Sequence, residues 1–229
     1  MALASSAFGA DNYEYWQDQN VFTMGTIGHH CTQIPYPDAA SAKSGLVATA
    51  TAGNHPFEKS KWFKSLNGNW KFNWVDNAAN RPKDFYYPNY ADSEWTEIPV
   101  PSCWERLGYG QPFHTAKPGS MLGHGALKPS DVPDAINPVG SYRKTFTLPA
   151  DWVGRQVILH FNGVSSACKV WLNGKFVGYD QDSWTDTEFN LTKFLQEGEN
   201  TLAVQVFRYC EGTQLEVMDM FLMSGIFRD

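Results

Sequence analysis

The Asn173-Gly174 dipeptide restricts the fold of this sequence more than any other feature. An Asn-Gly pair between two strand-like runs is typical of a two-residue β-hairpin turn, because both turn positions need positive φ. Before the turn, Cys168, Val170 and Leu172 alternate with the other residues of the run, and 175–177 would form the returning strand. The segment therefore predicts an antiparallel hairpin.

Three further segments alternate with the same period of two, which places every second residue on one face of a strand. Asn190 is expected to cap a single helical turn over 190–196. Many short strands separated by Gly, Pro and Asn turns predict an all-β fold with two packed sheets. The alternating apolar rows are Trp70, Phe72 and Trp74; Val157, Leu159 and Phe161; and Leu202, Val204 and Val206.

The chain divides into two regions by composition. Residues 1–60 read as an irregular N-terminal arm rich in small residues and Pro, in which Asp38 is expected to cap a short helix reaching Ala42. Residues 61–229 read as one β domain, and a hydrophobic content of 42% is enough for a core. Residues 116–134 are expected to form one long exposed loop.

Charge and motif content exclude several classes of function. The net charge is -6 and no basic run is present, which argues against nucleic acid and against an anionic membrane surface as partners. No apolar stretch approaches the ~18 residues of a membrane span. The four cysteines lack CxxC spacing, so neither a zinc site nor another cofactor is expected.

Four blocks of sequence carry a family resemblance: residues 66–72, 98–104, 137–146 and 171–183. In this order they resemble the N-terminal sugar-binding domain of family 2 glycoside hydrolases, the β-galactosidases, over about residues 15–229. The resemblance implies an antiparallel jelly-roll β-sandwich that is galactose-binding-domain-like. In that family the catalytic carboxylates lie in a later barrel domain, so we expect no glycosidase activity from this chain alone. The family occurs in the cytoplasm and the periplasm, which leaves the compartment of a soluble chain open.

The resemblance also names ligand-binding positions. Asp182 matches the Asp of the family's Gln-Asp-Ser-Arg phrase, which contacts substrate and a sodium ion, whereas Cys103 replaces the Asn of the Pro-Ser-Asn-Trp phrase. The segment 211–222 departs most from the family, with apolar residues in place of polar ones. The candidate ligand-binding residues are Lys169, Asp182, Trp184, Gln214, Glu216, Val217, Met218, Asp219 and Phe221.

Three readings of function follow. The first is a non-catalytic carbohydrate-binding domain, a piece of a β-galactosidase. The second is a small-molecule site on the same scaffold, repurposed by divergence or by engineering, because apolar residues have replaced polar ones in the segment that faces sugar. The third is a folding domain with no site of its own. We expect a monomer, or a weak dimer through exposed apolar residues of 218–222.

A repurposed site would have three candidate chemistries. Cys103 and His114 flank a Gly108-Tyr109-Gly110 turn, and a thiolate beside an imidazolium could attack activated esters. Lys169 in an apolar pocket could form a Schiff base, although a lysine on an exposed sheet face is the simpler alternative. A carboxylate of Asp182, Asp186 or Asp219 could act as a base beside Trp184.

Overall fold

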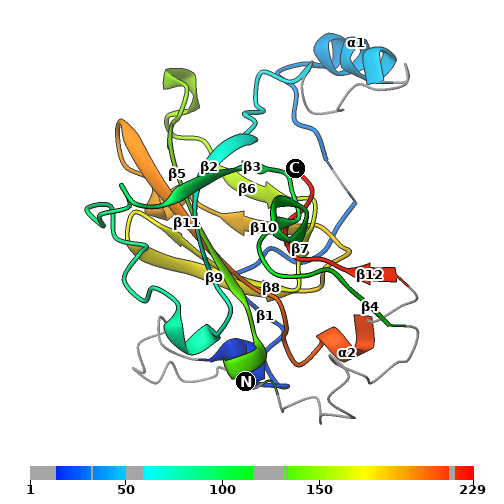
Figure 1. The fold of residues 1–229 in the computed structure, drawn as a ribbon. Coiled ribbons are helices and arrows are strands. Elements are labelled where there is room, and N and C mark those ends of the chain that lie inside the picture. Colours follow the sequence, from blue (N-terminus) through cyan, green and yellow to red (C-terminus); the bar gives the residue numbers. More distant parts are fainter. Residues whose placement is uncertain (1–13, 32, 50–58, 116–131, 133, 217–219) are drawn as a thin grey trace.

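A single antiparallel sheet of seven strands forms the body of the molecule, in the order β1-β9-β8-β11-β5-β2-β3. The computed structural model describes residues 14–229 except 32, 50–58, 116–131, 133 and 217–219 (Figure 1). The strands of this sheet are β1 (Thr23–Met24), β2 (Gly68–Val75), β3 (Thr96–Val100), β5 (Val139–Thr147), β8 (Ala167–Leu172), β9 (Lys175–Gln181) and β11 (Glu199–Phe207).

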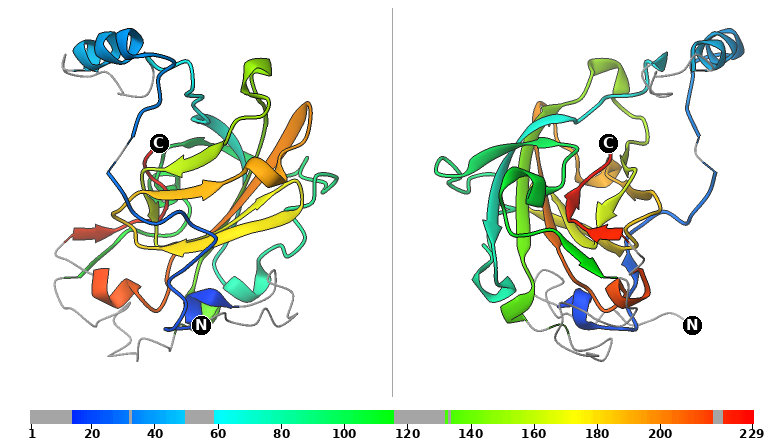
Figure 2. Two further views of the ribbon diagram at one scale, coloured as in Figure 1. Left: turned by 180° about the vertical axis from the view of Figure 1, so that it is seen from behind. Right: turned by 45° about the vertical axis from the view of Figure 1, so that its right-hand side comes forward.

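Three two-stranded sheets accompany the large one. They pair β6 (Ile158–Phe161) with β10 (Thr187–Asn190), β7 (Val164–Ser165) with β13 (Gly225–Ile226), and β4 (Phe113–Thr115) with β12 (Met220–Leu222). The first two pairs form a second layer, and Figure 2 shows β6 and β10 lying over the large sheet. The fold is therefore an antiparallel β-sandwich, as the sequence predicted.

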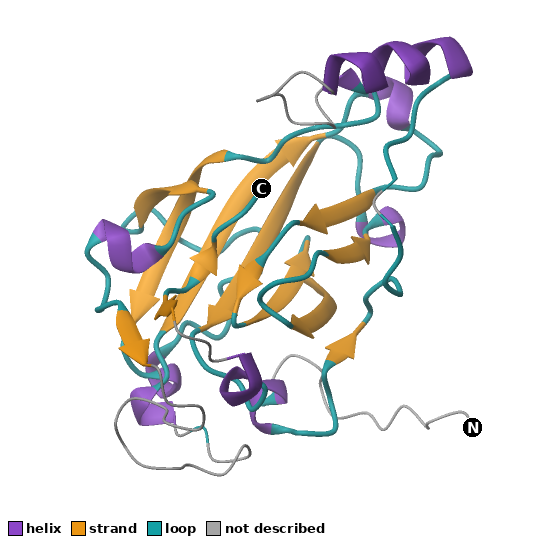
Figure 3. Ribbon diagram, turned by 90° about the vertical axis from the view of Figure 1, so that its right-hand side faces the viewer, coloured by secondary structure: helices purple, strands orange, loops and turns teal. Residues whose placement is uncertain are grey.

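The helices lie at the periphery of the strands (Figure 3). None of those in the described part of the chain is long and apolar enough to cross a membrane. Asp38 caps the longest helix by accepting a hydrogen bond from the Ser41 amide at 2.7 Å, which confirms the predicted cap. The helices are α1 (Ala39–Thr49), α2 (Thr213–Glu216), η1 (Tyr15–Gln17), η3 (Ala78–Asn80), η4 (Trp104–Leu107), η5 (Asp134–Ile136), η6 (Ala150–Trp152) and η7 (Thr192–Phe194).

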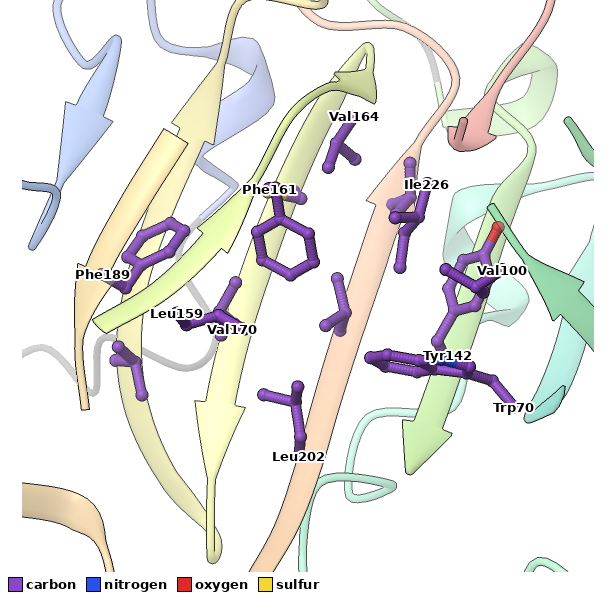
Figure 4. Close-up of a cluster of buried hydrophobic side chains, with 14 of the residues drawn as sticks. Trp70, Val100, Tyr142, Leu159, Phe161, Val164, Val170, Phe189, Leu202 and Ile226 are labelled. Carbon is purple, nitrogen blue, oxygen red and sulfur yellow. The ribbon is translucent and has the colours of Figure 1, made fainter. Parts of the chain in front are cut away.

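The main core fills the space between the two layers (Figure 4). Alternate residues of β2, β8 and β11 point into it, which confirms the period of two read from the sequence. Opposite them, β6 contributes Leu159 and Phe161, which are 6% and 4% exposed. Their neighbours Ile158 and His160 face outward and are only partly buried, so β6 separates the core from an outer surface.

The Asn173-Gly174 hairpin joins β8 to β9 as predicted. Both turn residues have positive φ, 53° for Asn173 and 80° for Gly174, which is the combination that a two-residue turn of this hand requires. The returning strand is longer than expected and reaches Gln181. This extension carries the chain to the end of the sheet, where the candidate site residues begin.

Strand β8 is buried on both faces, because chain segments cover the outer side of the large sheet. Trp171 stacks on Tyr86 with ring centroids 5.0 Å apart, and Lys169 is only 1% exposed beneath η1. The predicted loop over 116–134 lies mostly outside the described residues. Of its described members, Val132 is buried at 2% exposure, and Asp134 begins η5.

Candidate functional site

The loop that follows β9 holds Asp182 in an unusual backbone conformation. Its φ is 126°, in the left-handed region that side chains other than Gly seldom adopt. The carboxylate stabilises the turn, because Oδ1 accepts a hydrogen bond from the Trp184 amide at 3.1 Å and Oδ2 accepts one from Thr185 Oγ1 at 2.7 Å. The exposed carboxylate of Asp182 is therefore held in one place at the surface.

Ser183 ties this loop to α2 through two hydrogen bonds to one carboxylate. The Ser183 amide donates to Glu216 Oε1 at 2.6 Å, and its hydroxyl donates to Oε2 at 2.7 Å. Burial raises the pKa of Glu216, and these hydrogen bonds work in the opposite direction because they stabilise the ionised form. We refer to Asp182, Ser183, Trp184 and Glu216 as the Ser183–Glu216 site.

Trp184 supplies an exposed aromatic surface beside the Asp182 carboxylate. The residue is 42% exposed. Its ring meets Phe227 at a centroid distance of 5.5 Å with the planes 65° apart, and its carbonyl accepts a hydrogen bond from Arg228 Nη1 at 3.2 Å. The C-terminal segment therefore fixes the position of Trp184 without covering it completely.

A buried acid lies directly behind this loop. Asp180, on β9, is 5% exposed. Its pKa is raised to about 7, chiefly by burial and in part by the charges of Asp182 and Glu216, although a hydrogen bond from the Thr187 hydroxyl acts in the opposite direction. Sequence reasoning missed Asp180, although its place within the 171–183 block was a signal that could have drawn attention to it.

The cavity enclosed at this site is small. Ser183, Glu216 and Thr213 line it together with Arg208 and Phe221, and its volume is about 20 Å³. Such a space admits about one water molecule. The cavity is therefore too small to hold a sugar ring.

Sodium binding at Asp182 stays a prediction. Both carboxylate oxygens already accept hydrogen bonds within the turn. Within the described ranges, no group of three or more His, Cys, Asp or Glu side chains could hold a metal ion.

The Cys103–His114 hydrolase is not supported. Cys103 precedes η4, where burial and the neighbouring Glu105 carboxylate raise the pKa of its thiol. A nucleophilic cysteine needs the opposite shift. His114 lies on β4 opposite Phe221 of β12, and the two rings are 5.2 Å apart.

Glu105, the acidic neighbour of Cys103, has a structural role. Its Oε1 pairs with Arg208 Nη1 at 3.2 Å, and its Oε2 accepts a hydrogen bond from the Ser224 amide at 2.8 Å. Burial raises the pKa of Glu105, and both partners lower it. This carboxylate ties the C-terminal segment to the sandwich through Ser224 and Arg208.

Lys169 does not lie on an exposed face of the sheet. Its ammonium nitrogen is 5.1 Å from the ring centroids of both Tyr15 and Trp16. At 1% exposure it does not reach solvent, and it does not line the small cavity. The rings of η1 cover it through cation–π contacts, which corrects the alternative of an exposed lysine, while its contact with a ligand stays a prediction.

The remaining candidates separate in space. Phe221 is 59% exposed on β12 and lines the small cavity, and its contact with a ligand stays a prediction. Asp186 lies 3.7 Å from His160 Nε2, on the side of the sandwich formed by β6 and β10. The side chain of Gln214 and all of Val217, Met218 and Asp219 lie outside the described residues.

A family model for the sugar binding domain of glycosyl hydrolases family 2 matches residues 63–229. The chain belongs to glycosyl hydrolase family 2. It is 38% identical over 221 residues to a β-galactosidase of Priestia megaterium, covering 96% of this chain and 20% of that protein. It is 38% identical over 230 residues to the β-galactosidase large subunit of Leuconostoc lactis, covering 95% and 34%.

A solved structure shares the fold. A β-glucuronidase of Bacteroides uniformis superimposes with a TM-score of 0.53 and 27% sequence identity, covering 72% of this chain and 17% of that one. In all of these comparisons the family 2 chain described here spans about a third or less of the relative's length.

Proposed function

We propose that this chain is a non-catalytic carbohydrate-binding domain of a larger family 2 enzyme that acts on β-galactosides. The match of almost the whole chain to β-galactosidases supports the substrate class. The observation that carries the binding role is the locked turn at Asp182. An acceptor that is already fixed loses little conformational freedom when it takes a hydrogen bond from a sugar hydroxyl.

Asp182 and Trp184 would contact different parts of a bound sugar. The exposed carboxylate accepts hydrogen bonds from hydroxyls, while the exposed indole offers an apolar face to the C–H side of a pyranose ring. Glu216 acts indirectly, as a positioning residue that holds Ser183 and therefore the loop. The chain supplies binding groups, and the catalytic carboxylates would belong to another part of the enzyme.

Ligand-observed NMR with methyl β-galactoside tests this proposal. One aromatic platform with one or two hydrogen bonds suggests a Kd on the order of 1 mM. We expect Asp182→Asn and Trp184→Ala each to weaken binding at least fivefold, and the same Asp→Asn change at exposed Asp76 to leave it unchanged. Absence of galactoside binding, or binding that ignores both Asp182 and Trp184, would overturn the proposal.

A second candidate function is the binding of an apolar small molecule on the same surface. Phe221 favours it, because it is 59% exposed and lines the small cavity, and Leu215 of α2 is 85% exposed. Saturation-transfer signals from aromatic esters or ketones, together with none from methyl β-galactoside, would favour this function over the first.

A further inference from the structure

A much larger cleft lies on another side of the sandwich. Its volume is about 880 Å³, within the roughly 300–1,000 Å³ of small-molecule sites. The N-terminal arm, the segment Trp62–Asn67 and the strands β6 and β10 enclose it. Among the residues that the structure describes, none lines both this cleft and the small cavity at the Ser183–Glu216 site, so any ligand here would occupy a separate site.

The N-terminal arm closes this cleft by extending the β6–β10 sheet. Thr26 forms a bridge with Phe189, and the Ile27 amide donates to the Glu188 carbonyl at 2.9 Å. The arm then places His30 over β10. A stretch read from the sequence as an irregular arm is therefore one wall of the cleft.

The polar wall of the cleft contains a carboxylate that is hydrogen-bonded to two histidines. Glu188 Oε2 is 2.9 Å from His30 Nε2, and Glu188 Oε1 is 2.8 Å from His160 Nδ1. His160 and Glu188 are also directly opposite each other in the β6–β10 register. The side chains of His160 and Glu188 are each 17% exposed. Partial burial and a shared partner orient these groups toward the cleft while leaving them accessible.

Aromatic side chains form the facing wall. Trp62, Trp152 and Tyr36 line the cleft and are partly buried. The Arg155 guanidinium stacks over the Trp62 ring, 3.5 Å from its centre, and Lys61 Nζ lies 4.2 Å from the same centre. Planar hydrogen-bond donors therefore cover part of the Trp62 surface, whereas Trp152 and Tyr36 carry no such cation in the described part of the chain. Apolar side chains of the main core, including Phe146 and Leu191, form the floor.

The charges around the cleft are balanced. Glu188 faces two imidazoles, and the carboxylate of Asp229 accepts a hydrogen bond from Asn67 Nδ2 at 2.9 Å. Two cations, Lys64 and Arg155, line the same space. A site of this kind offers donors, acceptors and aromatic faces without a net preference for an anion or a cation.

We infer that this cleft is a second carbohydrate site, which takes a neutral oligosaccharide. Hydroxyl groups are both donors and acceptors, so they pair with the carboxylate, imidazole, amide and guanidinium groups of the polar wall. The apolar faces of the sugar rings pack against the indoles of the opposite wall. The volume of about 880 Å³ leaves room for more than one sugar ring. The inference does not depend on the Ser183–Glu216 site.

Isothermal titration of the 229-residue chain with lactose and with cellotriose tests the second site. We expect saturable binding of at least one probe that Trp62→Ala and Glu188→Gln each weaken at least tenfold. Tyr87→Ala is the control for the removal of an aromatic side chain, because Tyr87 is 45% exposed and lines neither cavity, and it should leave this binding intact. If Trp62→Ala lowers the melting temperature markedly, the test rests on Glu188→Gln, because glutamine keeps the shape of the glutamate side chain.

Two outcomes would overturn the inference. One is that neither probe binds. The other is that binding is lost in Trp184→Ala and Asp182→Asn but kept in Trp62→Ala and Glu188→Gln, which would mean that only the Ser183–Glu216 site takes sugar. The opposite result is also informative. If a probe binds in a way that depends on Glu188 while the chain does not bind methyl β-galactoside, the proposed function is refuted and the second site is supported.

Discussion

Replacing the buried acid behind the candidate loop should stabilise the protein at neutral and alkaline pH. The pKa of Asp180 is raised from an ordinary 3.8 to about 7, chiefly by burial. The native state therefore binds a proton between these values that the unfolded state has released. Since stability falls with pH wherever the native state holds more protons, ionisation of Asp180 weakens the fold progressively from about pH 4 to about pH 7.

The size of the effect follows from the two pKa values. An interval from 3.8 to about 7 corresponds to about 4 kcal/mol, because each unit of pKa is worth about 1.4 kcal/mol. Asp180→Asn mimics the protonated acid, and its amide oxygen can still accept the hydrogen bond of the Thr187 hydroxyl. We expect the variant to be about 2–4 kcal/mol more stable at about pH 8 and nearly equal to the parent at about pH 4.

Urea unfolding of the parent and of Asp180→Asn across this pH range measures the difference directly. Asp76→Asn is the matched control, because Asp76 is exposed and the chemical change is the same. The control should leave the pH profile of the parent unchanged. A variant that is less stable than the parent at about pH 8, or one whose effect does not vary with pH, would refute the reasoning.

Two further predictions concern the core and the N-terminal arm. Gly140→Ala should lower the free energy of unfolding by about 1–3 kcal/mol in a urea titration. The added Cβ would lie 2.5 Å from Trp104 and 2.8 Å from Phe72, which are both buried. An unchanged urea midpoint would contradict this packing. The pKa of His30 is raised by its hydrogen bonds to the Cys31 carbonyl and to Glu188. The contribution of protonated His30 to docking of the N-terminal arm is therefore complete below about pH 6.5, and it is lost as the pH rises through the raised pKa of the folded state. Hydrogen exchange should show that protection of the Ile27 amide declines as the pH rises, and that this decline is absent in Glu188→Gln. The same pH dependence in the parent and in Glu188→Gln would argue against the contact between His30 and Glu188.

Local chemistry explains the parts of the fold that the sequence made predictable. The Asn173-Gly174 turn needs only two residues with positive φ, and the rows on β2, β6 and β11 need only the alternation of side chains along a strand. The jelly-roll assignment rested on the family blocks, and the family match over residues 63–229 confirms it. The division into an arm and a β domain remains a prediction.

Long-range contacts explain the parts that were not predictable. The strand pattern gave Lys169 an outward face, but η1, more than 150 residues earlier in the chain, covers it. Glu188 meets His30 across 158 positions, and nothing local in either segment indicates that contact. The pairing of His160 with Glu188 was more accessible, because both lie on the outward rows of neighbouring strands.

The central claim is that the turn at Asp182 and Trp184 binds carbohydrate. The most direct measurement is a titration of the isotope-labelled chain with methyl β-galactoside, followed by amide chemical shifts. The account predicts saturable shifts at Asp182, Ser183 and Trp184, with none at Lys169 beneath η1. Saturable shifts confined to segments outside the 182–185 turn, or no shifts at all, would contradict it.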